Sequence, residues 1–206
     1  MRYLEQALYT AMPWRNGKGV TREIAREPPA PAEFDWRVSL ASLDEDGPFS
    51  SYPTYQRVVV LVDGPGFTLD FADGSTQVLA ERGAAAVFQG DAAVVCRLHE
   101  GPCRDLSLMV RAPGTVLAVQ VLDPTQRFAL PVAVGAQRAV YGLAGQSELV
   151  LADAAPAAGP TLLKAGDCIL LDDTDGAAAL APTGAGSRAL LLEWTHFSSR
   201  SQRALG

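Results

Sequence analysis

The sequence predicts an all-β protein that consists of two small, jelly-roll-like β-barrels in tandem. Three observations lead to this fold class. Short apolar or alternating runs recur along the chain, Gly, Pro or Asp interrupts nearly every gap between them, and no stretch keeps a 3.6-residue period for ten or more residues. Regularly spaced, turn-bounded runs of this kind are typical of β-sandwiches and barrels. Helix should therefore be scarce.

The first half of the chain contains a series of these predicted strands. After a strand at Val20–Ala25 they cover, in order, Trp36–Leu43, Arg57–Val62, Phe67–Phe71, Ala84–Phe88, Ala92–Leu98 and Leu106–Val110. The runs are rich in Val, Leu and Phe, which suit a pleated and partly buried surface.

The second half of the chain repeats this plan. Phe67–Phe71 corresponds to Ser147–Leu151, Gly83–Phe88 to Gly166–Leu171, and Arg104–Met109 to Arg188–Glu193, at offsets of 80 to 84 residues. Chance similarity among strands rich in Ala, Val and Leu is the alternative. We interpret the constant order and spacing as two copies of one barrel, residues 1–112 and 113–206.

Composition narrows the functional class. The 206 residues are 48% hydrophobic, which is enough for a substantial core, and the net charge of -6 leaves no basic stripe for nucleic acid. The first thirty residues lack a signal-peptide pattern, and no apolar run approaches the roughly 18 residues that a membrane span requires. Three cysteines, an odd number, fit a reducing compartment. We expect a cytoplasmic protein without a membrane or nucleic-acid partner, and a homo-oligomer stays open.

The segment Met12–Glu23, ahead of the first apolar strand, contains several residue types that are rare in this chain. Asn16 is the only asparagine in the protein, Lys18 is one of two lysines, and Trp14 is one of three tryptophans. Proline and glycine in the same segment indicate a shaped loop. The segment is either part of a binding site or an ordinary turn that leads into the strand Val20–Ala25.

Five motifs carry a resemblance to a known family. They are Trp14–Ile24, Trp36–Ser42, Gly47–Ser50, Tyr52–Arg57 and Arg104–Arg111. In order and spacing they resemble the successive motifs of the HutD/Ves family, and the C-terminal half fits as far as Glu193-Trp194. The Gly-Asp pairs Gly90-Asp91 and Gly166-Asp167, each ahead of a buried run, also resemble a tandem cupin, or bicupin. The resemblance implies a proposed small-molecule binder, linked in bacteria to histidine utilisation or stress induction, and no established catalyst.

The sequence departs from the family pattern at three positions near the implied pocket. Thr54 and Gln56 stand where family members tend to carry Gly and an acidic residue, and Ser107 stands where Asn is usual. A serine cannot offer the paired carbonyl and amide of asparagine. The identity of the ligand is therefore open.

Arginine suggests the ligand class, because guanidinium groups match carboxylates with two parallel hydrogen bonds. Arg22, Arg37 and Arg57 each lie within a family-like motif. The resemblance implies a small carboxylate such as urocanate or formylglutamate, with Arg57 as its anchor. The candidate ligand-binding residues are Trp14, Asn16, Thr21, Glu23, Arg37, Ser39, Phe49, Tyr52, Arg57, Asp105 and Ser107. Strand alternation places Arg37 and Ser39 on one face, which is either the pocket floor or a solvated surface.

Metal and nucleophilic chemistry find little support in the sequence. The chain has two histidines and lacks the His-x-His pair of metal-binding cupins, so we expect no metal and no cofactor. The alternative is a thiolate and imidazole cluster of Cys96, His99 and Cys103. No catalytic residue is singled out. A metal-independent isomerase or hydrolase that uses Glu23 with Tyr52 as an acid/base pair is the alternative to a binding or sensing protein.

Overall fold

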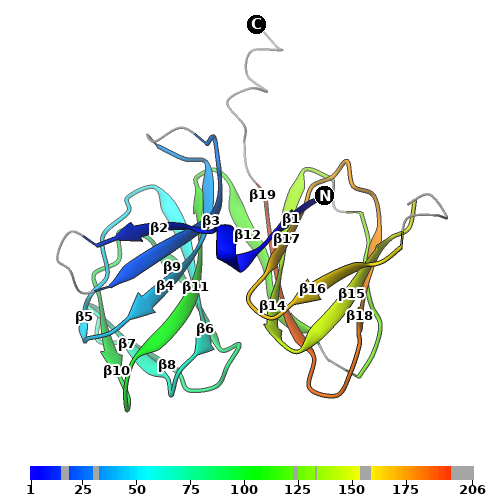
Figure 1. Cartoon of the computed structure of the whole chain (residues 1–206). Helices are drawn as coiled ribbons and strands as arrows, with labels where there is room; N and C mark the ends of the chain where they lie inside the picture. Colours follow the sequence, from blue (N-terminus) through cyan, green and yellow to red (C-terminus); the bar gives the residue numbers. More distant parts are fainter. Residues whose placement is uncertain (15–18, 30–32, 123–124, 133, 154–158, 196–206) are drawn as a thin grey trace, which may run out of the picture. The chain divides into compact units, whose positions relative to one another are not determined.

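The computed structural model describes residues 1–14, 19–29, 33–122, 125–132, 134–153 and 159–195. These residues form nineteen β-strands and a single 3-10 turn, η1 (Gln6–Leu8), which confirms the all-β class. The chain divides into two compact units (Figure 1). The N-terminal unit is Tyr9–Thr115, and the C-terminal unit is Val116–Thr195 together with Met1–Leu8. Within the described residues, no helix has the length and apolar character to cross a membrane.

The N-terminal unit contains two antiparallel sheets. The six-stranded sheet has the order β2 (Thr10–Pro13), β3 (Val20–Glu27), β4 (Trp36–Leu43), β11 (Cys103–Arg111), β6 (Tyr55–Asp63) and β9 (Ala85–Gln89). The four-stranded sheet has the order β5 (Gly47–Pro48), β10 (Val94–Leu98), β7 (Phe67–Phe71) and β8 (Thr76–Leu79). Val59 and Leu61 of β6 pack with Phe67 and Leu69 of β7 in one buried cluster. The hydrophobic core therefore lies between the two sheets, as in a β-sandwich.

The C-terminal unit has the same construction. Its five-stranded sheet has the order β1 (Arg2–Leu4), β17 (Cys168–Leu171), β14 (Ala136–Ala144), β19 (Arg188–Thr195) and β12 (Thr115–Leu122). Its four-stranded sheet has the order β13 (Phe128–Leu130), β18 (Ala178–Pro182), β15 (Gln146–Leu151) and β16 (Thr161–Lys164). Val140 and Leu191 of the first sheet pack with Leu149 and Leu180 of the second.

The two units share their strand order. The series β4-β11-β6-β9 corresponds to β12-β19-β14-β17, and β5-β10-β7-β8 corresponds to β13-β18-β15-β16. The three pairs of similar segments in the sequence lie on the corresponding strand pairs β7/β15, β9/β17 and β11/β19. Within the described residues the ladders leave every sheet open. The structure thus shows two β-sandwiches, and it does not show the closed barrels that the sequence predicts.

The first eight residues belong to the unit formed by the second half of the chain. Strand β1 pairs with β17, with Arg2 opposite Leu170. Asp167 holds the same segment, because its carboxylate accepts hydrogen bonds from the Tyr3 hydroxyl and, at 2.8 Å, from the backbone N–H of Gln6. The sequence-based division at residue 112 assigned this segment to the first unit. A three-residue strand leaves no periodic signal in the sequence, and the placement depends on pairing over more than 160 residues.

Thr54 gives a stability prediction. Its φ of 70° is in the left-handed region, where a β-branched side chain is strained by about 1–3 kcal/mol. The side chain is exposed, so that its removal sacrifices little burial. Glycine relieves the strain, but it makes the unfolded chain more flexible, which lowers the free energy of unfolding by about 0.4–1 kcal/mol. Thr54→Gly should therefore raise the free energy of unfolding, measured in urea, by about 1 kcal/mol.

Gly74 supplies the reverse control for Thr54, because a residue with a Cβ is introduced at a similar positive φ. Its φ is 87°, and a Cβ there would meet no atom within 4 Å, so Gly74→Ala introduces backbone strain without a steric clash. We expect Gly74→Ala to lower stability by about 1 kcal/mol. A Thr54→Gly variant that is less stable than wild type would contradict the strain at Thr54.

Candidate anion-binding site

The polar candidates of the N-terminal unit lie in adjacent rows across the six-stranded sheet. The rows are Thr21, Ala41, Asp105 and Leu61; then Glu23, Ser39, Ser107 and Val59; then Arg37, Met109 and Arg57. Val59 and Leu61 contribute to the core between the sheets. Because alternate residues of a strand share a face, these polar side chains lie on the face that opposes the four-stranded sheet. We call this face the inner face. The sequence left open whether the face with Arg37 and Ser39 is interior or solvated, and the structure shows that it is interior.

A β-bulge adds a residue that the sequence patterns did not reveal. The register of β3 against β4 shifts between Glu23 and Ala25, which places Arg26 opposite Arg37. The Arg26 guanidinium lies 3.8 Å from the Glu23 carboxylate. A bulge changes which side chains share a face, and simple alternation cannot anticipate it.

Arg57 is held between two aromatic rings. Its Cζ lies 4.4 Å from the ring centroid of Phe49 and 5.8 Å from that of Phe88. Its Nη1 donates to the carbonyl of Ser50 over 3.4 Å, whereas its Nε is buried and has no hydrogen-bond partner among the described residues. Burial lowers the pKa of Arg57, and the nearby Asp105 carboxylate opposes that shift. The guanidinium therefore keeps unused donor capacity beside two ring faces.

Arg37 has comparable surroundings. Its Cζ lies 4.8 Å from the ring centroid of Phe34 and 5.5 Å from that of Tyr52, and its Nη2 donates to the Met109 sulfur at 3.6 Å. A thioether is a weak acceptor, so that this contact satisfies little of the donor capacity. Phe34 was missed in the sequence because it precedes the predicted strand. The Tyr55 hydroxyl donates to its carbonyl at 2.7 Å.

Asp105 is the most buried acid of the inner face, with 1% of its surface exposed. Neither carboxylate oxygen has a hydrogen-bond donor in the part of the chain that the structure describes. Burial raises the pKa of Asp105 to about 7, and Arg57 offsets part of that rise. In the neighbouring row, the Ser107 hydroxyl donates to the carbonyl of Val58 at 3.1 Å.

The N-terminal segment contributes one ring to the unit. Trp14 packs on the apolar cluster of the N-terminal unit, and its Nε1 donates to the Thr21 hydroxyl at 2.8 Å. Gly19 permits this packing, since a Cβ there would lie 3.0 Å from the indole ring. The predicted site residue Asn16 lies outside the described residues. Arg22, by contrast, is exposed and opposite Leu40, off the inner face.

The residues of the alternative thiolate and imidazole cluster have other surroundings in the structure. Cys96 and Cys103 are buried, and burial raises the pKa of the Cys96 thiol to about 12. His99 Nε2 lies 3.0 Å from the Thr68 hydroxyl. Across the described ranges, no group of three His, Cys, Asp or Glu residues is arranged to hold a metal ion.

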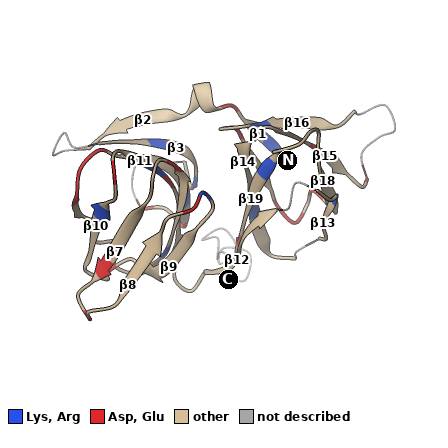
Figure 2. Ribbon diagram, turned by 90° about the horizontal axis from the view of Figure 1, so that it is seen from below, with Lys and Arg blue, Asp and Glu red and all other residues tan. Residues whose placement is uncertain are grey.

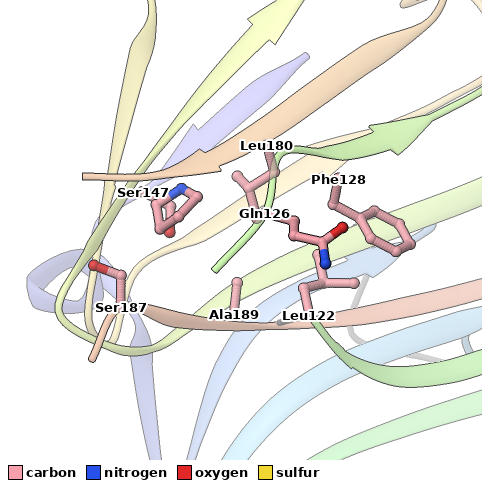
Figure 3. Close-up of a pocket in the computed structure, with 8 residues that line it drawn as sticks. Leu122, Gln126, Phe128, Ser147, Leu180, Ser187 and Ala189 are labelled. Atoms are coloured by element: carbon pink, nitrogen blue, oxygen red, sulfur yellow. The ribbon is translucent and has the colours of Figure 1, made fainter. Parts of the chain in front are cut away.

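A small pocket lies in the C-terminal unit (Figure 3). It is lined by Leu122, Gln126, Phe128, Ser147, Leu180, Pro182, Ser187 and Ala189. None of the predicted site residues contributes to it. Its lining is largely apolar and carries no charged group.

Arg138 is a buried arginine that sequence reasoning missed. It is 1% exposed, and it occupies in β14 the position that Arg57 occupies in β6, two residues after the first residue of the strand. Its Nε lies 3.6 Å from Glu193 Oε2, and its guanidinium nitrogens have no hydrogen-bond partner within the described chain. The signal was present, because Arg138 follows Arg57 by 81 residues, which is within the repeat offset.

The fold and the inner face together define a cupin-like all-β protein that carries polar side chains on one inner sheet face. A cupin 2 conserved barrel domain protein from Leptotrichia buccalis has a similar fold, with a TM-score of 0.54 at 11% identity over 91% of this chain and 96% of that one. More specifically, the chain belongs to the HutD family, whose model matches residues 6–191. The family resemblance of the five sequence motifs is thereby confirmed.

Two relatives illustrate this membership. The structure of HutD from Pseudomonas fluorescens, in a formate condition, has a TM-score of 0.78 at 28% identity and covers 96% of this chain and 99% of that one. Protein Ves from Citrobacter koseri is 40% identical over 113 residues, which are 54% of this chain and 59% of the relative. The alignment thus spans about three fifths of this curated relative.

Proposed function

We propose that this chain is a small-molecule binding or sensing protein whose N-terminal unit binds a small carboxylate through Arg57. One observation carries the proposal: the Arg57 guanidinium lies against Phe49, and its buried Nε has no acceptor among the described residues. A carboxylate supplies two acceptor oxygens in the plane that a guanidinium requires.

The charges of the inner face favour an anion. Three arginines, Arg26, Arg37 and Arg57, share it with two acids, Glu23 and Asp105. Burial raises the pKa of Asp105 to about 7, so that this acid contributes less than a full negative charge near neutrality. The resulting positive balance attracts a carboxylate, and the rings of Phe49 and Tyr52 suit a flat ligand.

Urocanate and formylglutamate are the ligands that we propose to examine first. Family membership links the chain to proteins named HutD, and both molecules combine a carboxylate with a further polar group. We also propose that each unit is a copy of one cupin barrel and that the copy with the inner face binds the ligand. The enzymatic alternative is a metal-independent isomerase or hydrolase that acts on a small carboxylate with an acid/base pair such as Glu23 and Tyr52.

A thermal-shift screen tests the carboxylate preference. Urocanate is compared with its primary amide and formylglutamate with its diamide, which keep the shape and remove the negative charge of the carboxylates. The acids should raise the melting temperature, because a ligand at a hundredfold excess over its dissociation constant stabilises the folded state by about 2.7 kcal/mol. The amides should leave it unchanged. Equal shifts by acid and amide, or no shift with either acid, would contradict the proposed function.

A further inference from the structure

Asp105 has an unusual position for an acid in a site that favours anions. It is almost fully buried on the same face as the cation that we propose as the anchor, and its two oxygens accept no hydrogen bond from the described residues. Two donors of the same unit have other acceptors. The Ser107 hydroxyl donates to the Val58 carbonyl, and the Trp14 indole donates to the Thr21 hydroxyl.

The groups around Asp105 give its carboxylate only partial compensation. The charged and titratable side chains that share its surroundings are Arg57 of β6, Arg37 of β4, Glu23 and Arg26 of β3, Cys96 of β10, Cys103 of β11, and Tyr52. Arg57 is the cation that acts directly on Asp105. A bound carboxylate would engage that same cation and bring a second negative charge, so two ionised carboxylates would then share one guanidinium.

We propose that Asp105 binds the carboxylate of the ligand as a neutral carboxylic acid, so that wherever Asp105 is ionised in the free protein the site takes up one proton together with the ligand. This inference rests on the proposed function. The Asp105 O–H donates to one oxygen of the ligand while Arg57 donates to the carboxylate, as in acid pairs that share a proton. Asp105 thereby becomes a residue that distinguishes a carboxylate from neutral ligands.

The direction of the pH dependence follows from burial. Burial raises the pKa of Asp105 in the ligand-free protein to about 7, and a bound anion raises it further. Below pH 7 the acid already carries its proton, so that affinity should be constant. Above pH 7 the proton must be taken from solvent, and affinity should fall by up to about tenfold for each pH unit.

Calorimetry with formylglutamate, whose carboxylates stay ionised from pH 6 to 9, tests the proton uptake. Titrations at pH 7.5 in two buffers of different ionisation enthalpy give the number of protons bound with the ligand. We expect a net uptake of more than half a proton for wild type and none for Asp105→Asn, whose amide mimics the neutral acid. Asp105→Asn should bind at pH 8.5 more tightly than wild type does. Asp70→Asn, which alters an acid on the other sheet, should keep the wild-type profile.

The outcomes separate the two proposals. Binding without proton uptake, and with the same pH profile in Asp105→Asn, would overturn the role of Asp105 and leave the proposed function standing. Carbon-13 NMR of ligand-free protein, with Asp105→Asn for assignment, follows the titration of the Asp105 carboxyl. A carboxyl that titrates in the ordinary acid range would also overturn the role of Asp105. If formylglutamate fails to bind at every pH from 6 to 9, both proposals fail for this ligand.

Discussion

The substitution Glu193→Gln should lower the free energy of unfolding by about 3 kcal/mol, because it leaves Arg138 as an uncompensated buried cation. Arg138 is 1% exposed, and its guanidinium nitrogens make no hydrogen bond to the described residues. The Glu193 carboxylate, 3.6 Å from Nε, is the acid paired with it. The Glu193 side chain is 23% exposed, which places the expected loss at the lower end of the range for broken buried pairs.

A double substitution separates the lost ion pair from general damage. Arg138→Met removes the cation and keeps an unbranched apolar chain, so Arg138→Met with Glu193→Gln should recover stability to within about 1 kcal/mol of wild type. An exposed pair provides the control. Figure 2 shows acidic and basic segments on the neighbouring strands β7 and β10, where Arg97 pairs with Asp70. Asp70→Asn should cost less than about 1 kcal/mol. Urea unfolding of the three variants and wild type measures these values, and a loss below about 1 kcal/mol in Glu193→Gln would contradict the account of Arg138.

The substitution Arg57→Ala should weaken carboxylate binding by about 2–5 kcal/mol, which is a factor of roughly thirty to a few thousand in the dissociation constant. The loss has two origins: the carboxylate is deprived of a charged double donor, and it remains in a partly desolvated site beside Phe49. Ser39→Ala removes a neutral hydroxyl from the same face and should cost only about 0.5–1.5 kcal/mol. Calorimetric titration gives both values, and their ranking distinguishes an ionic anchor from general packing.

Much of the fold could be predicted from local patterns. The turn-bounded apolar runs indicated strands, and the segments related by 80 to 84 residues lie on corresponding strands of the two units. The pairing of β1 with β17 could not be predicted, because it joins three residues to a strand in the other half of the chain. Closed barrels were predicted from the repeat, whereas the described ladders form open sheets.

Most residues of the candidate site could be predicted, but the face of the sheet that is interior could not. Alternation correctly grouped Arg37 with Ser39, but it could not show which face of the sheet is interior. The reason is physical: Val58 and Val59, neighbours on opposite faces of β6, are both fully buried. Only the contacts of Val59 with Phe67 and Leu69 identify the inner face. Arg26 escaped prediction because a bulge moves it there, and Arg138 because the second half lacks the polar motifs that surround Arg57 in the first.

The central claim, that Arg57 anchors a carboxylate on the inner face, is tested most directly by titrating formylglutamate into three proteins at pH 6.5. They are wild type, Arg57→Ala and the matched control Arg97→Ala, in which the lost arginine is exposed and belongs to the four-stranded sheet. Wild type and Arg97→Ala should bind with the same affinity, and Arg57→Ala should bind at least about thirtyfold more weakly. Equal affinity of all three proteins would contradict the claim and assign Arg57 a purely structural role.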